Sequence, residues 1–283
     1  MRVAAIGLGS MGLGAARNLL KAGLDVVGVD PRAEAREAFA GIGGRAVARA
    51  ADIDPDTEAV LVLVVTAAQT EAALFGEGGA AARLAPGAVV ISSATMSPEA
   101  ARALAAKAEA SGLLYLDAPV SGGARGAAEG AMVVMASGPE AAFARAGPVF
   151  DAVARKVWRL GDAPGIGSTV KMVNQLLAGV HIAAAAEALA LGIRAGVDPA
   201  LLHEVICTAA GNSWMWGDRV PHILAGDDTP RSAVDIFVKD LGIVLESGRA
   251  LTFPLPLTAA AHQLFLAVSA AGHGGRDDAF VIR

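Results

Sequence analysis

The stretch Gly7-Leu8-Gly9-Ser10-Met11-Gly12 decides the fold, because it has the G-x-G-x-x-G spacing and separates two different kinds of segment. Residues 2–8 form a short apolar run that predicts a buried strand. Residues 15–22 predict a helix, which Gly23 ends. Residues 25–30 predict a second strand that finishes in an acid. A glycine-rich turn in this order of elements is typical of a dinucleotide-binding unit.

Each glycine of this turn has a physical role in that interpretation. The first allows the tight turn, the second lets the backbone approach a pyrophosphate, and the third lets the helix pack on the strand. The amide groups at the start of the helix then bind the phosphates. We therefore expect cofactor contacts from Gly7, Leu8, Gly9, Ser10, Met11 and Gly12. The alternative is a plain glycine-rich turn, since the chain has 34 glycines.

Asp30 bears on which dinucleotide is bound. Its carboxylate accepts hydrogen bonds from the ribose hydroxyls of NAD and repels the additional phosphate of NADP. Arg32 weakens this argument, because a guanidinium two residues later pairs well with a phosphate. We expect both residues to contact the cofactor, with NAD favoured over NADP.

The alternation of strand and helix continues along the chain. Residues 59–65 and 88–92 predict strands, and Thr66 and Thr95 follow them. Ser97 then begins a helix. This order predicts a parallel, doubly wound sheet, in which ligands lie at the carboxyl ends of the strands. Both threonines are therefore candidate cofactor contacts, or else turn and cap hydroxyls.

A further predicted strand, residues 113–120, ends in the turn Ser121-Gly122-Gly123-Ala124. Backbone amides and a serine hydroxyl at a strand end are suited to holding a substrate carboxylate. The equally weighted alternative is a hinge before the next strand, residues 131–136. A strand at 156–161 is expected to close the sheet, which gives a dinucleotide-binding domain over residues 1–161.

The second half, residues 162–283, predicts a separate all-α domain. Helices are expected at about 167–195, 199–209, 233–250 and 257–271. Asp198-Pro199 and Thr229-Pro230 are predicted helix starts. The first helix is apolar on most of its sides, which indicates burial against other helices, including those of a second subunit. A homodimer or homotetramer is therefore expected.

Lys171 lies at the start of this otherwise apolar helix, and Asn174 and Gln175 follow on roughly the same face. Burial lowers the pKa of a lysine toward the range where a neutral amine accepts a proton near neutral pH. We interpret Lys171 as a general base, with Asn174 and Gln175 fixing substrate hydroxyls.

Other polar and aromatic residues of this half leave alternatives open. Lys239 either pairs with an acid or reaches into the active site. Trp214 and Trp216 are aromatic packing or a wall of the substrate pocket. Asp235 and Asp240 are interpreted as solvated or capping residues.

Composition excludes several classes of function. The net charge is −5 and there is no basic run, which argues against nucleic acid as a partner. The apolar run 176–193 is broken by His181 and Glu187, which argues against a membrane span. Cys207 is the single cysteine and the five histidines show no metal-ligand spacing, so neither a disulfide nor a metal site is expected. A cytoplasmic protein is expected.

Four motifs in order resemble the β-hydroxyacid dehydrogenase family, which includes 3-hydroxyisobutyrate dehydrogenase, tartronate semialdehyde reductase and 6-phosphogluconate dehydrogenase. They are Gly7-Leu8-Gly9-Ser10-Met11-Gly12, Asp117-Ala118-Pro119-Val120-Ser121-Gly122-Gly123, Gly167-Ser168-Thr169-Val170-Lys171-Met172-Val173-Asn174-Gln175, and Lys239-Asp240-Leu241. The resemblance implies a Rossmann-type domain, then a helical domain built around a long interdomain helix.

The resemblance also implies roles for single residues. Lys171 resembles the catalytic lysine and Asn174 the amide that holds the substrate beside it. Ser121, Gly122 and Gly123 resemble the carboxylate-binding turn. Two more residues correspond to positions that contact cofactor or substrate, namely Thr95 and Lys239. Many relatives have Asn where this chain has Thr66, and NADP-dependent relatives often have Asn-Arg in place of Asp30-Pro31.

Stretches such as Gly211-Asn212-Ser213-Trp214-Met215 and Arg219-Val220-Pro221-His222 are similar to one branch of the family, whose members oxidise a four-carbon sugar acid at C2 with NAD. Rival hypotheses are oxidation of three-carbon or branched hydroxy acids, reduction of tartronate or succinic semialdehyde with NADPH, and a non-catalytic dinucleotide-binding protein. Imine reductases resemble the same fold, but they usually lack the lysine at position 171.

Overall fold

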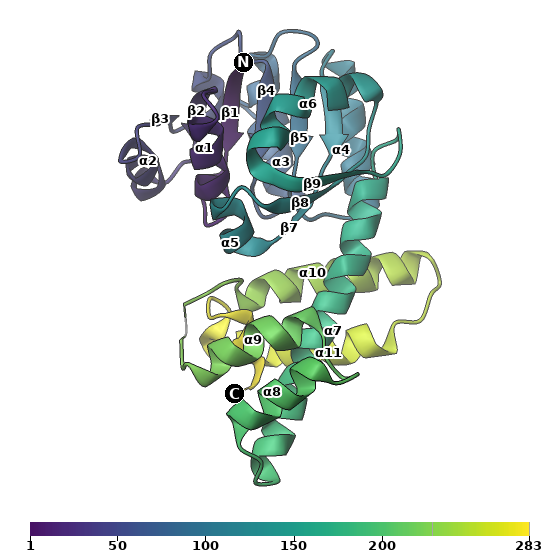
Figure 1. Ribbon diagram of the computed structural model, residues 1–283. Coiled ribbons are helices and arrows are strands. Elements are labelled where there is room, and N and C mark those ends of the chain that lie inside the picture. Colours follow the sequence, from purple (N-terminus) through teal and green to yellow (C-terminus); the bar gives the residue numbers. More distant parts are fainter. Residues whose placement is uncertain (228, 283) are drawn as a thin grey trace. The chain divides into compact units, whose positions relative to one another are not determined.

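The computed structural model describes residues 1–227 and 229–282 and divides the chain into two compact units, Met1–Lys171 and Met172–Arg283. The first unit contains a six-stranded sheet in the order β3-β2-β1-β4-β5-β6 (Figure 1). All neighbouring strands run parallel. The strands are β1 (Arg2–Ile6), β2 (Asp25–Val29), β3 (Arg45–Val47), β4 (Ala59–Val62), β5 (Val89–Ser92) and β6 (Leu114–Asp117). The predicted doubly wound parallel sheet is confirmed.

Helices cover both faces of this sheet, so its strands are apolar on both sides. Ala5 and Ile91 pack on one face with α1 and α6, whereas Ala4 and Val90 pack on the other with α3 and α4. The helices of this unit are α1 (Gly12–Lys21), α2 (Ala33–Ala40), α3 (Ala67–Phe75), α4 (Pro98–Ala110), α5 (Gly123–Ala128) and α6 (Glu140–Val153). Short 3₁₀ helices occupy Ala50–Asp52 and Ala80–Ala82.

The expectation that residues 156–161 close the main sheet is wrong. A separate sheet contains β7 (Val120–Ser121), β8 (Met132–Ala136) and β9 (Ala154–Arg159), with β7 antiparallel and β9 parallel to β8. The predicted strand 113–120 divides at Ala118-Pro119, between β6 and β7. Proline has no amide hydrogen for a ladder bond, and Asp117, which pairs with Ser92 in the main sheet, also pairs with Ser137. The chain therefore leaves the main sheet at this point.

The second unit is helical, as predicted, and is built on α7 (Ile166–Arg194), which begins in the first unit. The other helices are α8 (Pro199–Thr208), α9 (Trp214–Leu224), α10 (Val234–Ala250) and α11 (Pro256–Val268). A π-helical turn, Ser269–His273, and a 3₁₀ helix, Asp278–Ile282, follow. Among the described helices, α7 alone is long and apolar enough to span a membrane by length and composition.

Two apolar clusters pack against α7 within this unit. Ile182 packs with Phe237 of α10 and Phe265 of α11, whose rings stack with centroids 5.1 Å apart. Leu189 packs with Trp216 and Val220 of α9. Helix α7 thus serves as the helix on which the others of this unit pack, while apolar side chains such as Leu191 on its remaining surface stay exposed.

Helix starts in this unit were predicted with mixed success. Asp198 caps α8 by accepting a hydrogen bond from the Leu201 amide at 2.8 Å, as predicted. The start predicted at Thr229-Pro230 is wrong, because α10 begins at Val234. Helix α9 was not predicted. Ser213 caps it by accepting a hydrogen bond from the Trp216 amide, and a serine in this position is a helix-start signal that the sequence contains.

Candidate functional site

The glycine-rich turn joins β1 to α1, and its three glycines differ in the space around them. A Cβ on Gly7, whose φ is +90°, would lie 2.7 Å from the Leu63 carbonyl oxygen, and one on Gly12 would lie 1.7 Å from the Gly7 oxygen. A Cβ on Gly9 would meet only the tip of the Arg32 side chain, at 4.0 Å. Gly7 and Gly12 are therefore required by the packing of the protein itself, whereas Gly9 leaves open space next to the backbone.

The start of α1 has the properties of a phosphate site. Met11 occupies the N-cap position without any side-chain cap, and the first turn contains no acidic residue, while Lys21 lies in the last turn. Ser10 is exposed beside it. An uncapped helix start presents amide donors and the positive end of the helix dipole to an anion. The turn and helix together fit the diphosphate of a dinucleotide.

Asp30 follows β2 and is 3% exposed. Its carboxylate accepts hydrogen bonds from the Leu8 amide at 2.9 Å and from the Arg32 amide at 3.0 Å. The Arg32 guanidinium also binds it, with its own side chain 54% exposed. Burial by itself would raise the pKa of Asp30, but the hydrogen bonds from Arg32 and Leu8 outweigh it and hold the pKa below its usual value. Asp30 is therefore a fixed negative charge beside the turn.

The two candidate threonines, Thr66 and Thr95, differ in whether they cap a helix. The Thr66 hydroxyl caps α3 by accepting from the Gln69 amide at 3.1 Å, and the Gln69 side chain accepts from the Thr66 amide. This reciprocal pair is a capping box, so the structural alternative for Thr66 is present. Thr95 is half-buried in the loop after β5, and Ser97, not Thr95, caps α4.

The turn at Ser121, Gly122 and Gly123 follows β7. Gly122 and Gly123 have φ values of +128° and +60°, which only glycine adopts at little cost, and both are exposed. The predicted loop after them is instead the short helix α5, which packs closely on α1: a Cβ on Gly14 would lie 2.8 Å from the Ala128 amide nitrogen. The turn is thereby held beside α1, the helix whose start is the candidate phosphate site.

Lys171 lies in the second turn of α7 and is 7% exposed. The start of this helix is held by Asp117, the last residue of β6. The Asp117 carboxylate accepts from the Gly165 amide at 2.9 Å, the Ser168 amide at 2.8 Å and the Ser168 hydroxyl at 2.7 Å. Burial raises the pKa of Asp117, while these hydrogen bonds oppose the rise. Asp117 is not among the predicted site residues, although an acid at the end of an apolar run is a signal that the sequence contains.

Within the helical unit, four polar side chains form a chain of contacts. Asn174 donates to Gln175 at 3.0 Å, Gln175 donates to Asp240 at 2.5 Å, and the Lys239 ammonium lies 2.7 Å from Asp240. The interpretation of Asp240 as solvated or capping is wrong, because it is 1% exposed and lies in the middle of α10. Lys239 is paired with an acid, one of the two alternatives considered for it.

Of the two tryptophans in this stretch, Trp216 is buried and Trp214 is exposed. Trp216 is 3% exposed and packs against α7, and His203 stacks on it at a centroid distance of 6.3 Å. Trp214 is 68% exposed. Packing therefore accounts for Trp216.

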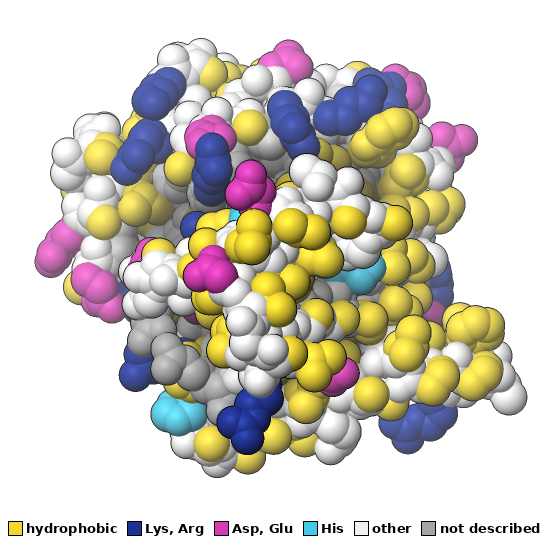
Figure 2. All heavy atoms as spheres, turned by 60° about the horizontal axis from the view of Figure 1, so that its bottom comes forward, with side chains coloured by type: hydrophobic (Ala, Val, Ile, Leu, Met, Phe, Trp, Pro, Cys, Tyr) yellow, Lys and Arg dark blue, Asp and Glu magenta, His cyan; other side chains and the backbone are white. Residues whose placement is uncertain are grey.

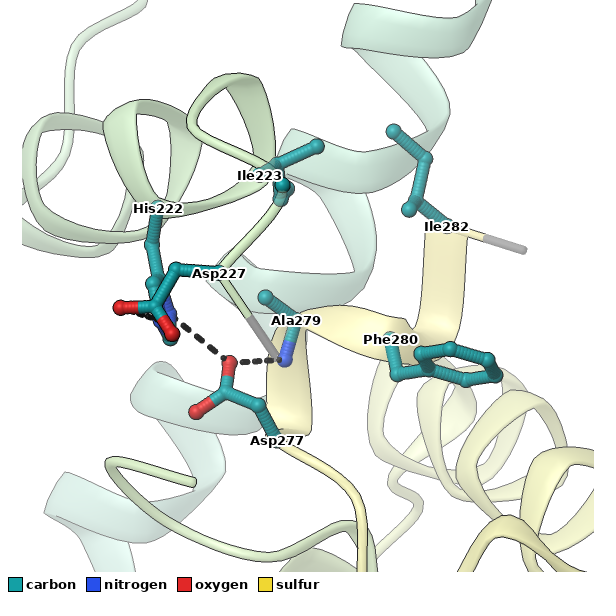
Figure 3. A pocket seen from close by; sticks show the side chains of 8 residues that line it. His222, Ile223, Asp227, Asp277, Ala279, Phe280 and Ile282 are labelled. Carbon is teal, nitrogen blue, oxygen red and sulfur yellow. Dashed lines mark hydrogen bonds and ion pairs between the residues drawn. The ribbon is translucent and has the colours of Figure 1, made fainter. Parts of the chain in front are cut away.

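No group of three or more potential metal ligands occurs among residues 1–227 and 229–282. His222 is a buried structural histidine whose ring nitrogens lie 3.3 Å from carboxylate oxygens of Asp227 and Asp277, as Figure 3 shows. These two acids face opposite sides of the ring, which does not suit a shared metal ion.

Two family models match nearly the whole chain. Residues 2–161 match the NAD-binding domain of 6-phosphogluconate dehydrogenase, and residues 165–283 match the NAD-binding family of NADP-dependent 3-hydroxyisobutyrate dehydrogenase.

Curated relatives and solved structures agree with these matches. The chain is 58% identical to an L-threonate dehydrogenase from Cupriavidus necator, over 99% of this chain and 95% of the relative. It is 50% identical to an L-threonate dehydrogenase from Escherichia coli K12, over 99% and 93%. A crystal structure described as 3-hydroxyisobutyrate dehydrogenase from Salmonella typhimurium is 52% identical, with a TM-score of 0.93 over 100% of this chain and 99% of that one.

The glycine-rich turn, the buried acid after β2 and the lysine on α7 occur here in a chain that matches dehydrogenases along its full length. The protein is an NAD(P)-dependent oxidoreductase acting on a hydroxy acid, and it belongs to the β-hydroxyacid dehydrogenase family.

Proposed function

We propose that this protein oxidises L-threonate at C2 to 2-oxo-tetronate with NAD. The observation that carries the proposal is the identity of 58% and 50% to two L-threonate dehydrogenases over almost the entire chain. The identity to a 3-hydroxyisobutyrate dehydrogenase from Pseudomonas aeruginosa is lower, at 36% over 97% of this chain.

Lys171 is the proposed general base. As a neutral amine it takes the proton of the substrate hydroxyl, while the nicotinamide, when bound, supplies the hydride acceptor. Asn174 holds the substrate hydroxyls beside it. Gln175 has both ends of its amide engaged, by Asn174 and by Asp240, so it acts by orienting Asn174. Lys239 contacts substrate or cofactor from its ion pair with Asp240.

The substrate carboxylate is proposed to bind at Ser121, Gly122 and Gly123. The positive φ values of the two glycines turn their backbone in a way that other residues resist, and the serine hydroxyl is a further donor. Hydride transfer requires the carbon that bears the hydroxyl to be held in one orientation. Binding the carboxylate at a fixed turn holds one end of the substrate and so restricts the orientation of that carbon.

The cofactor is proposed to bind at residues 7–12, with Asp30 on the ribose and with Arg32, Thr66 and Thr95 as further contacts. NAD is preferred over NADP because the Asp30 carboxylate is buried and keeps its charge. Residues 1–161 form the proposed dinucleotide-binding domain, and residues 162–283 form the proposed substrate and oligomerisation domain.

The protein is proposed to be cytoplasmic and to form a homodimer or homotetramer. Figure 2 shows many hydrophobic side chains on one face of the molecule. Large exposed apolar residues of the helical unit include Leu191, Ile193, Leu201, Val205 and Trp214. A second copy of the chain covering such residues would remove their apolar surface from water.

The experiment is a rate measurement with L-threonate, D-erythronate, D-glycerate and 3-hydroxyisobutyrate, each with NAD and with NADP, monitored by the absorbance of the reduced nicotinamide. A clear preference for L-threonate with NAD supports the proposal. Preference for 3-hydroxyisobutyrate, the substrate named for the solved structure at 52% identity, would retain the family and reject the substrate. Higher rates with NADP than with NAD would reject the proposed cofactor.

A further inference from the structure

The first turn of α7 is held by a residue that lies far away in the sequence. Asp117 is 1% exposed, and its carboxylate accepts all three hydrogen bonds described above from Gly165 and Ser168. Since helix starts leave amides without partners, an acid placed there satisfies them. The helix provides no such acid itself, because its first turn contains no acidic residue.

A second contact fixes the same turn from the backbone side. Asp117 and Ser137 exchange backbone hydrogen bonds of 3.0 and 2.9 Å, and the Ser137 hydroxyl accepts from the Gly167 amide at 3.0 Å. Gly167 is packed so closely that a Cβ would lie 2.4 Å from the Met135 oxygen and 2.6 Å from the Asp117 oxygen. The turn therefore lies directly against the ends of β6 and β8.

Lys171 follows Ser168 by three residues, which places both on one side of the same helix. The positive end of a helix dipole disfavours an ammonium group in the first turns, and a carboxylate at the cap opposes that effect. The position of the first turn therefore determines where Lys171 lies. The negative charge at the cap influences the pH at which Lys171 loses its proton.

We propose that Asp117 is a positioning residue for Lys171: it fixes the first turn of α7 and supplies the negative charge which that turn lacks. The inference rests on the proposed function, in which Lys171 is the base. It assigns no contact with substrate or cofactor to Asp117.

Other ionisable groups near this cap do not supply the same charge. Tyr115 is 3% exposed, and burial raises the pKa of its hydroxyl, so it is neutral across the working range. Arg102 of α4 lies beside Gly165 and is paired with the exposed Glu99. Asp162 is exposed to solvent. Asp117 is the acid in contact with the helix start.

The test combines Asp117→Asn with two readouts at several pH values. The first is the acid limb of kcat/KM for the preferred hydroxy acid. The second is the acetylation of Lys171 by acetic anhydride, quantified by mass spectrometry, which requires no substrate. Loss of the negative charge makes the ammonium less stable, so both midpoints are expected to move to lower pH by about 0.5–1 unit. The KM for NAD is expected to stay the same.

Thr169→Ala is the matched control, because the Thr169 hydroxyl bonds to the Gly165 carbonyl within the helix and not to Asp117. It is expected to leave both midpoints unchanged. A folded Asp117→Asn protein with unshifted midpoints would overturn the inference. So would a loss of activity in that variant with an unchanged pH profile, which is what a purely structural role gives.

Ser168→Ala provides a second test if Asp117→Asn does not fold. This variant retains the Asp117 charge and removes the hydroxyl that donates to the Asp117 carboxylate. The expected result is a kcat lower by about 3–30-fold with an unchanged acid limb and an unchanged KM for NAD. A normal kcat in this variant would overturn the positioning role. Failure of the proposed function can be distinguished from failure of this inference. If Lys171 is not the base, Lys171→Ala retains its turnover. The acetylation of Lys171 in the Asp117→Asn variant reports the effect of the Asp117 charge in either case.

Discussion

The guanidinium of Arg32 binds both oxygens of the Asp30 carboxylate, with Nε–Oδ1 at 3.0 Å and Nη2–Oδ2 at 2.9 Å. In the proposed cofactor site, the acid that would repel the NADP phosphate is thus paired with the cation that would attract it. If both contact the cofactor as proposed, its choice depends on the balance of these two neighbouring charges.

The first prediction concerns this balance. Asp30→Asn removes the charge and retains a hydrogen-bond acceptor for the Leu8 amide, so the ratio of kcat/KM with NAD to that with NADP is expected to fall by about 10–100-fold. Arg32→Ala is expected to raise the same ratio, because the repulsion by Asp30 is then unopposed. Asp25→Asn, at the exposed start of β2, serves as the control. Movement of the ratio in the same direction for Asp30→Asn and Arg32→Ala would contradict the prediction.

The second prediction compares two glycines of the same turn. Gly12→Ala places a methyl group against the Gly7 oxygen and is expected to lower the thermal midpoint strongly, because backbone must move. Gly9→Ala meets open space and is expected to keep the midpoint near that of the wild type while weakening NAD binding by about tenfold or more. Calorimetry and NAD titration measure the two effects. Normal NAD affinity in Gly9→Ala would show that the pyrophosphate does not approach there.

The third prediction concerns the proposed base. Lys171→Ala is expected to lower turnover by ~10²–10⁴-fold, because general base catalysis contributes about this much. NAD binding is expected to persist, since the glycine-rich turn is unaffected. Lys107→Ala, at an exposed lysine on α4, controls for loss of a positive charge. Steady-state kinetics and NAD titration are the measurements, and near-normal turnover in Lys171→Ala would remove the base assignment.

The fourth prediction uses the contact between Gln175 and Asp240. Gln175→Glu places a second carboxyl beside a buried carboxylate, and two such groups cannot both ionise at low cost. The folded variant then retains a proton that the unfolded chain releases. Its free energy of unfolding is therefore expected to fall, relative to wild type, as the pH rises from about 4 to 7. Urea unfolding at several pH values tests this. Glu187→Gln, on an exposed face of α7, is the control, and a pH-independent difference for Gln175→Glu would argue against the contact.

The fifth prediction concerns the C-terminal segment. Arg219 of α9 binds Asp278 through two hydrogen bonds of 2.6 and 2.8 Å, and Asp278 is 0% exposed. Asp278→Asn removes this carboxylate but leaves Asp218, which also binds the guanidinium, so the variant is expected to lose roughly 1–3 kcal/mol of unfolding free energy. Glu129→Gln, which breaks the exposed pair with Arg125, is expected to change little. Similar losses in the two variants, measured by urea unfolding, would contradict this account.

Much of the fold could be predicted from local signals. The strand, glycine turn, helix and acid at residues 2–30 require only apolar runs, a fixed glycine spacing and a helix end, all within about thirty residues. The cap at Asp198 is likewise a local hydrogen bond to the Leu201 amide. Capping chemistry and apolar periodicity therefore located most elements to within a few residues.

The errors occurred where one segment depends on another. Whether β9 joins the main sheet or a second one is decided by where the chain leaves β6, at Asp117 and Pro119, and no pattern within β9 itself records that. Helix α5 was missed because its six residues are glycine, alanine and one arginine, which carry little periodicity.

For the candidate site, the sequence by itself determined the residue types: a glycine turn with Asp30 after it, a lysine at the head of an apolar helix, and Lys239 beside Asp240. Only the tertiary structure decided their partners. It pairs Asp30 with Arg32, buries Asp240 against Gln175 and places Asp117 at the start of α7, fifty-one residues from its partner Ser168. The physical reason is that hydrogen bonds and ion pairs depend on distance in space, and a sequence pattern specifies distance only within a single helix, strand or turn.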